Sequence, residues 1–295
     1  MTTREDIAEI PGAELRYRLA GTPGTLPTIV LENGWGASYD YFALLQEALA
    51  PHTQLLLYNR AGIGGSMAHE TLTAEGMSRH LAALLDALGI RAPVVIAGQS
   101  YGGLICGVHA ALMPQRLRAV VQIDPTAERT DEQIDATLGS MRGLGKVLRL
   151  LAALRIPEPF FAPHMPELPA ADTAQLRRNA FGNAASLRAA GIELDLLQDI
   201  RRVCAQPSPV PRLVISAGTT EEVRNALFRL LVSPERARSL LGRMQAQHEI
   251  TAGRGGPGSR WITLPHTHGA LVVSRSGAAA TATCMIDYLS SLPTT

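Results

Sequence analysis

Positive charge is sparse and scattered in this sequence, and lysine is almost absent. Of the 27 basic residues only Lys146 is a lysine, and the arginines form no continuous block. The formal net charge at pH 7 is +1. Nucleic acids and anionic membranes attract clustered positive charge. Neither is therefore expected as a partner.

Cysteines and long apolar runs are also scarce. The three cysteines, Cys106, Cys204 and Cys284, are far apart and odd in number, which indicates neither a disulfide framework nor a metal site. No run of 18 apolar residues occurs, and residues 1–6 are polar and lack the apolar centre of a signal peptide. A cytoplasmic protein without a membrane segment is expected.

What the sequence does contain fits an ordinary folded domain. It has 295 residues, of which 46% are hydrophobic and 18% are charged. This length is sufficient for one large α/β domain with a substantial core.

Short apolar runs alternate with longer amphipathic segments, the pattern of a mostly parallel sheet covered on both faces by helices. The expected strands are Ile7–Ile10, Glu14–Leu19, Thr28–Leu31, Leu55–Tyr58, Pro93–Ala97, Ala119–Ile123, Arg212–Ala217 and Trp261–Leu264. The first two flank Pro11-Gly12 and predict a hairpin. The expected helices are Tyr41–Leu49, Thr73–Leu88, Gly103–Met113, Glu221–Leu231, Pro234–His248 and Gly277–Leu292.

The alternation stops between residues 126 and 209, where no clear strand is present. This stretch contains helix-like segments at Ile134–Leu154 and Thr173–Val203. We interpret it as a helical cap over the carboxyl edge of the sheet, inserted between core segments 1–125 and 210–295. An ordinary pair of long crossovers is the alternative.

The pentapeptide Gly98-Gln99-Ser100-Tyr101-Gly102 joins an expected strand to an expected helix. A serine on such a sharp turn has strained backbone geometry, and the flanking glycines let the turn close without Cβ clashes. The turn exposes the hydroxyl at the carboxyl edge of the sheet, near a helix N-terminus that stabilises a developing anion. Ser100 is therefore predicted to be a nucleophile.

A serine nucleophile needs a base within hydrogen-bond reach. Two histidines, His266 and His268, follow the last expected strand, on the same sheet edge as Ser100. His268 is preferred because it lies deeper in the loop and precedes a small glycine. No third ligand is clustered with this pair, so a metal site is disfavoured. The other six histidines have no motif around them and are interpreted as surface or packing residues.

An oxyanion hole needs two backbone N–H groups that point at the developing charge. Tyr101, directly after Ser100, is expected to supply one. The loop after the third strand contains Gly34 and Gly36, which let the backbone approach a ligand, and Trp35 is the expected second donor. Asn33, in the same loop, is expected to bind substrate.

With these motifs the chain resembles the α/β-hydrolase superfamily over nearly its full length. The matching segments are residues 32–36, 58–66, 84–90, 98–103 and 123–125. The resemblance implies a serine hydrolase fold with a helical cap and no cofactor. Three positions depart from the common pattern: Asn33 and Gln99 replace histidines, and Asn59 replaces an aspartate.

The resemblance leaves the acid of the triad open. In most members it follows the strand that here is Arg212–Ala217, where Glu221 and Glu222 are the nearest candidates. In some members it follows the strand after the nucleophile, where Asp124 lies. Asp124 is preferred, and the two glutamates are the alternatives.

These residues favour hydrolysis of a carboxylic ester or related acyl bond in a small, largely apolar molecule. Phe160 and Phe161 in the expected cap suggest an apolar substrate pocket, although cap phenylalanines also pack a cap. The alternatives are a cofactor-free lyase or perhydrolase that uses the same triad, and a non-catalytic ligand-binding protein of the same fold. The sequence does not indicate an oligomeric state.

Overall fold

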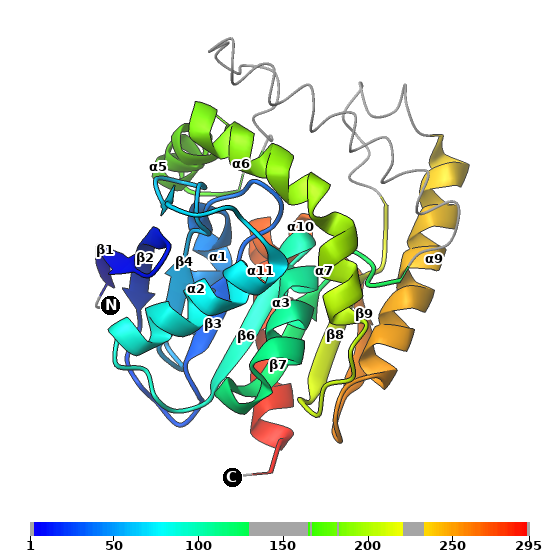
Figure 1. The fold of residues 1–295 in the computed structure, drawn as a ribbon. Coiled ribbons are helices and arrows are strands. Elements are labelled where there is room, and N and C mark those ends of the chain that lie inside the picture. Colours follow the sequence, from blue (N-terminus) through cyan, green and yellow to red (C-terminus); the bar gives the residue numbers. More distant parts are fainter. Residues whose placement is uncertain (1–2, 130–164, 166, 182, 221–232, 294–295) are drawn as a thin grey trace.

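The computed structural model describes residues 3–129, 165, 167–181, 183–220 and 233–293. In this part of the chain nine strands form one sheet, in the order β1-β2-β4-β3-β6-β7-β8-β9, with β5 paired to β2 (Figure 1). The strands are β1 (Thr3–Ile10), β2 (Ala13–Ala20), β3 (Ile29–Glu32), β4 (Leu55–Tyr58), β5 (Met67–Ala68), β6 (Val94–Gln99), β7 (Leu117–Ile123), β8 (Arg212–Ala217) and β9 (Arg260–Leu264).

The centre of the sheet is parallel, from β4 through β9 along the strand order. β1 and β2 form the predicted antiparallel hairpin at one edge, and β2 joins β4 antiparallel. This is the mostly parallel α/β arrangement that the alternating sequence pattern predicts, and the prediction of fold class is confirmed.

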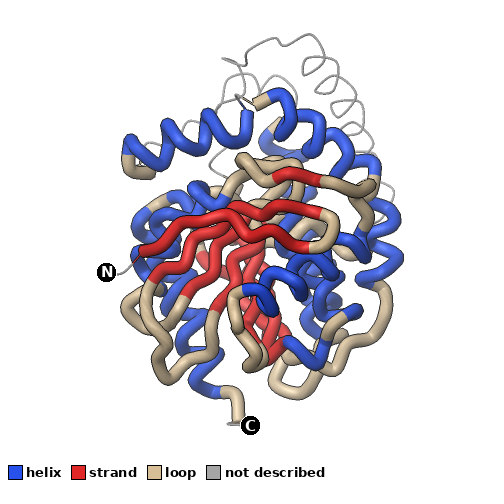
Figure 2. Tube along the Cα trace, turned by 60° about the vertical axis from the view of Figure 1, so that its left-hand side comes forward, coloured by secondary structure: helices blue, strands red, loops and turns tan. Residues whose placement is uncertain are grey.

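Helices pack on both faces of the sheet, as the two views of the chain show (Figures 1 and 2). The helical elements are η1 (Tyr39–Phe42), α1 (Ala43–Leu49), α2 (Ala74–Ala87), α3 (Tyr101–Leu112), η2 (Pro114–Arg116), α5 (Ala170–Leu176), the π-helical turn η3 (Arg177–Phe181), α6 (Ala184–Asp195), α7 (Leu197–Cys204), α9 (Pro234–Gly253), α10 (Ala270–Val273) and α11 (Arg275–Ser291).

Strand alternation explains the two layers. Successive side chains of a strand point to opposite faces of the sheet. Accordingly, Ile29 and Leu31 of β3 pack with residues of α1 and α11, whereas Val30 between them packs with residues of α2 and α3. Because both faces are covered, the central strands are buried throughout and appear as continuous apolar runs in the sequence.

The stretch Thr173–Val203, expected to be helix-like, falls on the helical elements α5, η3, α6 and α7. The side chain of Asn183 accepts a hydrogen bond from the N–H of Ala185 and begins α6 as an N-cap. In Figure 1, α5 and α6 cross the top of the molecule. The predicted helices Ile134–Leu154 and Glu221–Leu231 lie outside the described residues.

The four loops that carry the candidate residues follow β3, β6, β7 and β9, all strands of the parallel part. Their carboxyl ends therefore meet at one edge of the sheet, the usual position for a ligand site in an open α/β fold. Among the described residues, no helix is long and apolar enough to cross a membrane.

Candidate active site

Ser100 occupies the sharp turn between β6 and α3 that the sequence predicts. Its φ is 59° and its ψ is −121°, an unfavourable backbone conformation for a residue with a side chain. The turn is fastened to the neighbouring loop, since the Ser100 N–H donates to the Ile123 carbonyl at 3.0 Å and the Ser100 carbonyl accepts from the Thr126 N–H at 2.9 Å. The strained serine is thus held by the surrounding backbone.

The glycines beside Ser100 are needed because backbone segments approach closely there. A Cβ on Gly98 would lie 2.4 Å from the Gly102 carbonyl oxygen. A Cβ on Gly102 would lie 2.2 Å from the Glu32 carbonyl oxygen. The sequence argument that these glycines prevent Cβ clashes is confirmed.

His268 and Asp124 form a hydrogen-bonded pair at the same sheet edge. His268 Nδ1 lies 2.6 Å from Asp124 Oδ2, and the carboxylate accepts the Nδ1–H. The second carboxylate oxygen, Oδ1, accepts from the Ala217 N–H at 2.9 Å. Burial alone would raise the pKa of Asp124, but hydrogen bonding to His268 and the nearby charges hold that pKa below its usual value. The carboxylate therefore stays ionised and fixes the imidazole with Nδ1 protonated.

A second histidine supports the loop that carries Asp124. Buried His248 of α9 donates from Nε2 to the Pro125 carbonyl at 2.8 Å, and its Nδ1 lies 2.8 Å from the Ser216 hydroxyl oxygen. Burial lowers the pKa of His248, which keeps this ring neutral. His248 lies 123 residues from Pro125 along the chain and has no motif around it, so no local pattern indicates this role.

Gln99, the residue before the predicted nucleophile, contacts the predicted base. Gln99 Nε2 lies 2.8 Å from His268 Nε2. Because Nδ1 of His268 holds its proton toward Asp124, Nε2 presents a lone pair and the Gln99 amide donates to it. That lone pair is the one that would receive a proton from Ser100.

Ser100, His268 and Gln99 line one cavity of about 260 Å³. The other residues around it are Gly34, Trp35, Ala37, Tyr41, Tyr101, Thr126, Met165, Leu176, Leu194 and Leu197. Among these described residues none carries a permanent charge, and leucine, methionine and aromatic side chains predominate. The lining favours an uncharged, largely apolar ligand.

The two expected oxyanion donors border this cavity. Tyr101 begins α3, where the first N–H groups have no acceptor within the helix, and Trp35 lies in the loop after β3. Asn33 has a different environment: its side-chain amide donates to the Tyr58 carbonyl at 2.6 Å, and it is not among the residues that line the cavity. Its substrate-binding role stays a prediction.

Four candidate residues lie outside the described residues: the alternative acids Glu221 and Glu222, and the cap residues Phe160 and Phe161. In the described part of the chain, no three His, Cys, Asp or Glu side chains gather in a way that could hold a metal ion.

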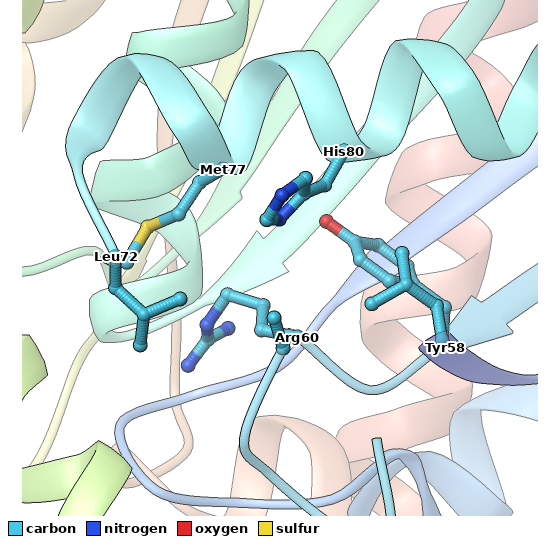
Figure 3. Close-up of a pocket in the computed structure, with 7 residues that line it drawn as sticks. Tyr58, Arg60, Leu72, Met77 and His80 are labelled. Atoms are coloured by element: carbon cyan, nitrogen blue, oxygen red, sulfur yellow. The ribbon is translucent and has the colours of Figure 1, made fainter. Parts of the chain in front are cut away.

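A second cavity lies beneath α2 and is far smaller, at about 10 Å³. Figure 3 shows its lining residues Tyr58, Arg60, Leu72, Met77 and His80. This volume suffices for about one water molecule and excludes an organic ligand.

Comparison with known proteins agrees with the architecture. The family model of the alpha/beta hydrolase fold matches residues 27–153. The chain has the α/β-hydrolase fold. A solved α/β hydrolase, the enol-lactonase from Burkholderia xenovorans LB400, is similar in fold with a TM-score of 0.63, 24% identity, and coverage of 97% of this chain and 100% of the lactonase.

Two curated relatives show the range of similarity. A pimeloyl-[acyl-carrier protein] methyl ester esterase from Xanthomonas campestris pv. campestris is 37% identical over 100 residues, which are 34% of this chain and 37% of the esterase. A monoacylglycerol lipase from Homo sapiens is 24% identical over 147 residues, which are 48% of this chain and 44% of the lipase. The chain spans less than half the length of the curated relatives it matches.

Proposed function

We propose that this α/β hydrolase is a serine hydrolase that cleaves a carboxylic ester or related acyl bond through an acyl-enzyme. One observation carries the proposal: strained Ser100 lines the same cavity as His268, whose Nδ1 donates to Asp124 at 2.6 Å. A hydroxyl, a neutral imidazole and an ionised carboxylate in this order form a nucleophile, a base and an orienting acid.

In the proposed reaction, Ser100 Oγ attacks the acyl carbon while its proton moves to Nε2 of His268. The carbonyl oxygen becomes an oxyanion that accepts hydrogen bonds from the N–H groups of Trp35 and Tyr101. The carbon–oxygen bond to the leaving group then breaks, and His268 returns the proton to the departing alcohol. Water attacks the acyl-enzyme in the same way, which releases the acid and restores Ser100.

The cavity supports a small, largely apolar substrate. Its volume of about 260 Å³ is lined by apolar side chains such as Met165 and Leu176. A carboxylate or phosphate on the substrate would be buried here without a cationic partner among the described lining residues, which costs several kcal/mol per ion. Esters with neutral alkyl or aryl groups are therefore the proposed substrates.

We also propose that residues 126–209 act as a cap over this cavity. In support, the described part of that stretch supplies Leu176 of α5, Leu194 of α6 and Leu197 of α7 to the cavity lining. Segments 1–125 and 210–295 supply the nucleophile, base and acid in this proposal.

A panel of chromogenic esters tests the proposed function. p-Nitrophenyl acetate, butyrate, octanoate and a succinate monoester are assayed with the wild type and with Ser100→Ala. The neutral esters are expected to be hydrolysed, the anionic one poorly, and kcat of Ser100→Ala is expected to fall by about 10⁴–10⁶-fold. Wild-type turnover by the folded alanine variant would refute the serine mechanism.

A further inference from the structure

Helix α6 is hydrogen-bonded to both residues that the proposed mechanism uses as oxyanion donors. The Trp35 Nε1–H donates to the Ala190 carbonyl at 2.7 Å, and the Tyr101 hydroxyl donates to the Glu193 carbonyl at 3.0 Å. The Gly36 N–H donates to Glu193 Oε2 at 3.1 Å. Three separate contacts thus join α6 to the β3 loop (residues 33–37) and to the start of α3.

Glu193 is also paired with Arg60, which binds the β3 loop and does not line the large cavity. Arg60 Nε donates to Glu193 Oε1 at 2.7 Å. Its Nη1 donates to the Asn33 carbonyl at 2.6 Å and its Nη2 to the Gly34 carbonyl at 3.0 Å. Glu193 and Arg60 are 1% and 4% exposed, so these bonds are shielded from water.

The charges around Arg60 are balanced by carboxylates on two elements. Glu32, at the end of β3, accepts from Arg60 Nη1 at 2.7 Å. Arg60 therefore contacts two carboxylates, one on β3 and one on α6. Burial would lower the pKa of Arg60, but the carboxylates of Glu193 and Glu32 raise that pKa above its usual value. The guanidinium therefore remains charged, and charge-assisted hydrogen bonds of this kind are about twice as strong as neutral ones.

The hydrogen bond to the Gly34 carbonyl fixes the direction of the next N–H. The peptide between Gly34 and Trp35 is trans, so the Trp35 N–H points opposite to the Gly34 carbonyl. That carbonyl points toward Arg60, which does not line the large cavity, whereas Gly34 and Trp35 do. The Trp35 N–H is therefore directed away from Arg60.

We propose that Glu193, acting through Arg60 and the Gly36 N–H, is a positioning residue for the oxyanion hole. Helix α6, from the stretch inserted between β7 and β8, would then be part of the catalytic framework and would not act as a detachable lid. The inference deepens the proposed serine-hydrolase function and rests on it.

Glutamine cannot replace Glu193 in this arrangement. Both carboxylate oxygens accept from N–H groups, Oε1 from Arg60 and Oε2 from Gly36. A glutamine side chain offers one acceptor oxygen, so its NH₂ group would face one of the two donors. Glu193→Gln therefore releases either the Gly36 N–H or Arg60, and the β3 loop loses one of its fixed points.

The test is Glu193→Gln, assayed on a p-nitrophenyl ester and on an alkyl trifluoromethyl ketone, which forms a tetrahedral anionic adduct with a serine hydroxyl. We expect kcat to fall by about 10–100-fold, with KM changed by less than about threefold, because a misdirected donor weakens mainly the transition state. Affinity for the ketone is expected to fall by the same factor as kcat/KM.

Ser186→Ala is the matched control on the same helix. Ser186 is buried, and its hydroxyl accepts from the Gly64 N–H at 3.0 Å and donates to the Asn179 carbonyl at 2.6 Å. Neither partner belongs to the β3 loop. We expect the control to keep kcat within about threefold of wild type even where its thermal unfolding midpoint falls.

Two outcomes overturn the proposal. In the first, Glu193→Gln keeps kcat and ketone affinity within about threefold of wild type. In the second, Ser186→Ala loses as much kcat and ketone affinity as Glu193→Gln does, which would mean that α6 has only a structural role. If Glu193→Gln does not fold, Trp35→Phe removes the bond to Ala190 and keeps the backbone N–H. It should lower kcat and ketone affinity together by about three- to tenfold, and unchanged values would refute the proposal. A wild type that hydrolyses no ester and forms no ketone adduct would refute the proposed function itself.

Discussion

Replacing Asp124 by asparagine changes one atom of the proposed triad and leaves the backbone free of new strain. Asp124 has φ 42°, in the left-handed region, which asparagine tolerates better than other side chains except glycine. Alanine at this position would mix backbone strain with the loss of the carboxylate. Asp124→Asn therefore isolates the chemistry.

The contacts of Asp124 determine the size of the expected effect. Oδ2 accepts from His268 Nδ1–H at 2.6 Å and Oδ1 accepts from the Ala217 N–H at 2.9 Å, whereas asparagine has one acceptor oxygen. If that oxygen stays on Ala217, the amide NH₂ faces Nδ1 of His268 and shifts the ring proton to Nε2. The imidazole then has no lone pair for the Ser100 proton, and kcat is expected to fall by about 10⁴-fold, or about 5.4 kcal/mol of activation free energy.

The assay measures kcat on p-nitrophenyl acetate and the thermal unfolding midpoint of the same preparation. A large loss of kcat with a folded protein is the expected result. Glu221→Gln and Glu222→Gln are the controls, each expected to change kcat by less than about tenfold. If kcat of Asp124→Asn stays within about tenfold of wild type and kcat of one glutamine variant falls by several orders of magnitude, the assignment of Asp124 as the acid is refuted.

The remaining predictions concern the base, the residue before the nucleophile and the turn. His268→Ala should be about as inactive as Ser100→Ala, whereas His266→Ala should keep kcat/KM within about threefold; the opposite ranking would transfer the base to His266. Gln99→Met removes the amide that donates to His268 Nε2 at 2.8 Å. A net hydrogen bond is worth about 1 kcal/mol, so without it the reaction of Ser100 with a fluorophosphonate should become about fivefold faster. A slower reaction would contradict the idea that Gln99 competes with Ser100 for the Nε2 lone pair. Gly102→Ala places a Cβ 2.2 Å from the Glu32 carbonyl oxygen. Its free energy of unfolding by urea should fall by about 3 kcal/mol or more, and an unchanged value would contradict the packing argument.

The parallel core was predictable because strands covered on both faces appear as short apolar runs between turn residues. The predicted strands Leu55–Tyr58 and Arg212–Ala217 match β4 and β8 to the residue. The two-residue strand β5 and the short helix α10 were missed, because neither is long enough to show a periodic pattern. The N-cap at Asn183, which begins α6, was also missed.

Of the candidate residues that sequence reasoning found, Ser100 and Asp124 directly follow β6 and β7, and His268 lies in the loop after β9. Local motifs identify such residues. The residues that it missed act through partners distant in the sequence: His248 on the Pro125 carbonyl and Glu193 on the β3 loop. The sequence around a buried polar side chain on a helix does not indicate which loop that side chain will contact. Only the folded arrangement of the chain shows the contact.

Covalent labelling with a fluorophosphonate shows whether Ser100 is the nucleophile. The wild type and Ser100→Ala are incubated with a fluorophosphonate at pH 8, and intact-protein and peptide masses are measured. We expect one phosphonyl adduct per chain, located on Ser100, and none on the alanine variant. Absence of an adduct on folded wild type, or an adduct on another residue that persists in Ser100→Ala, would contradict it.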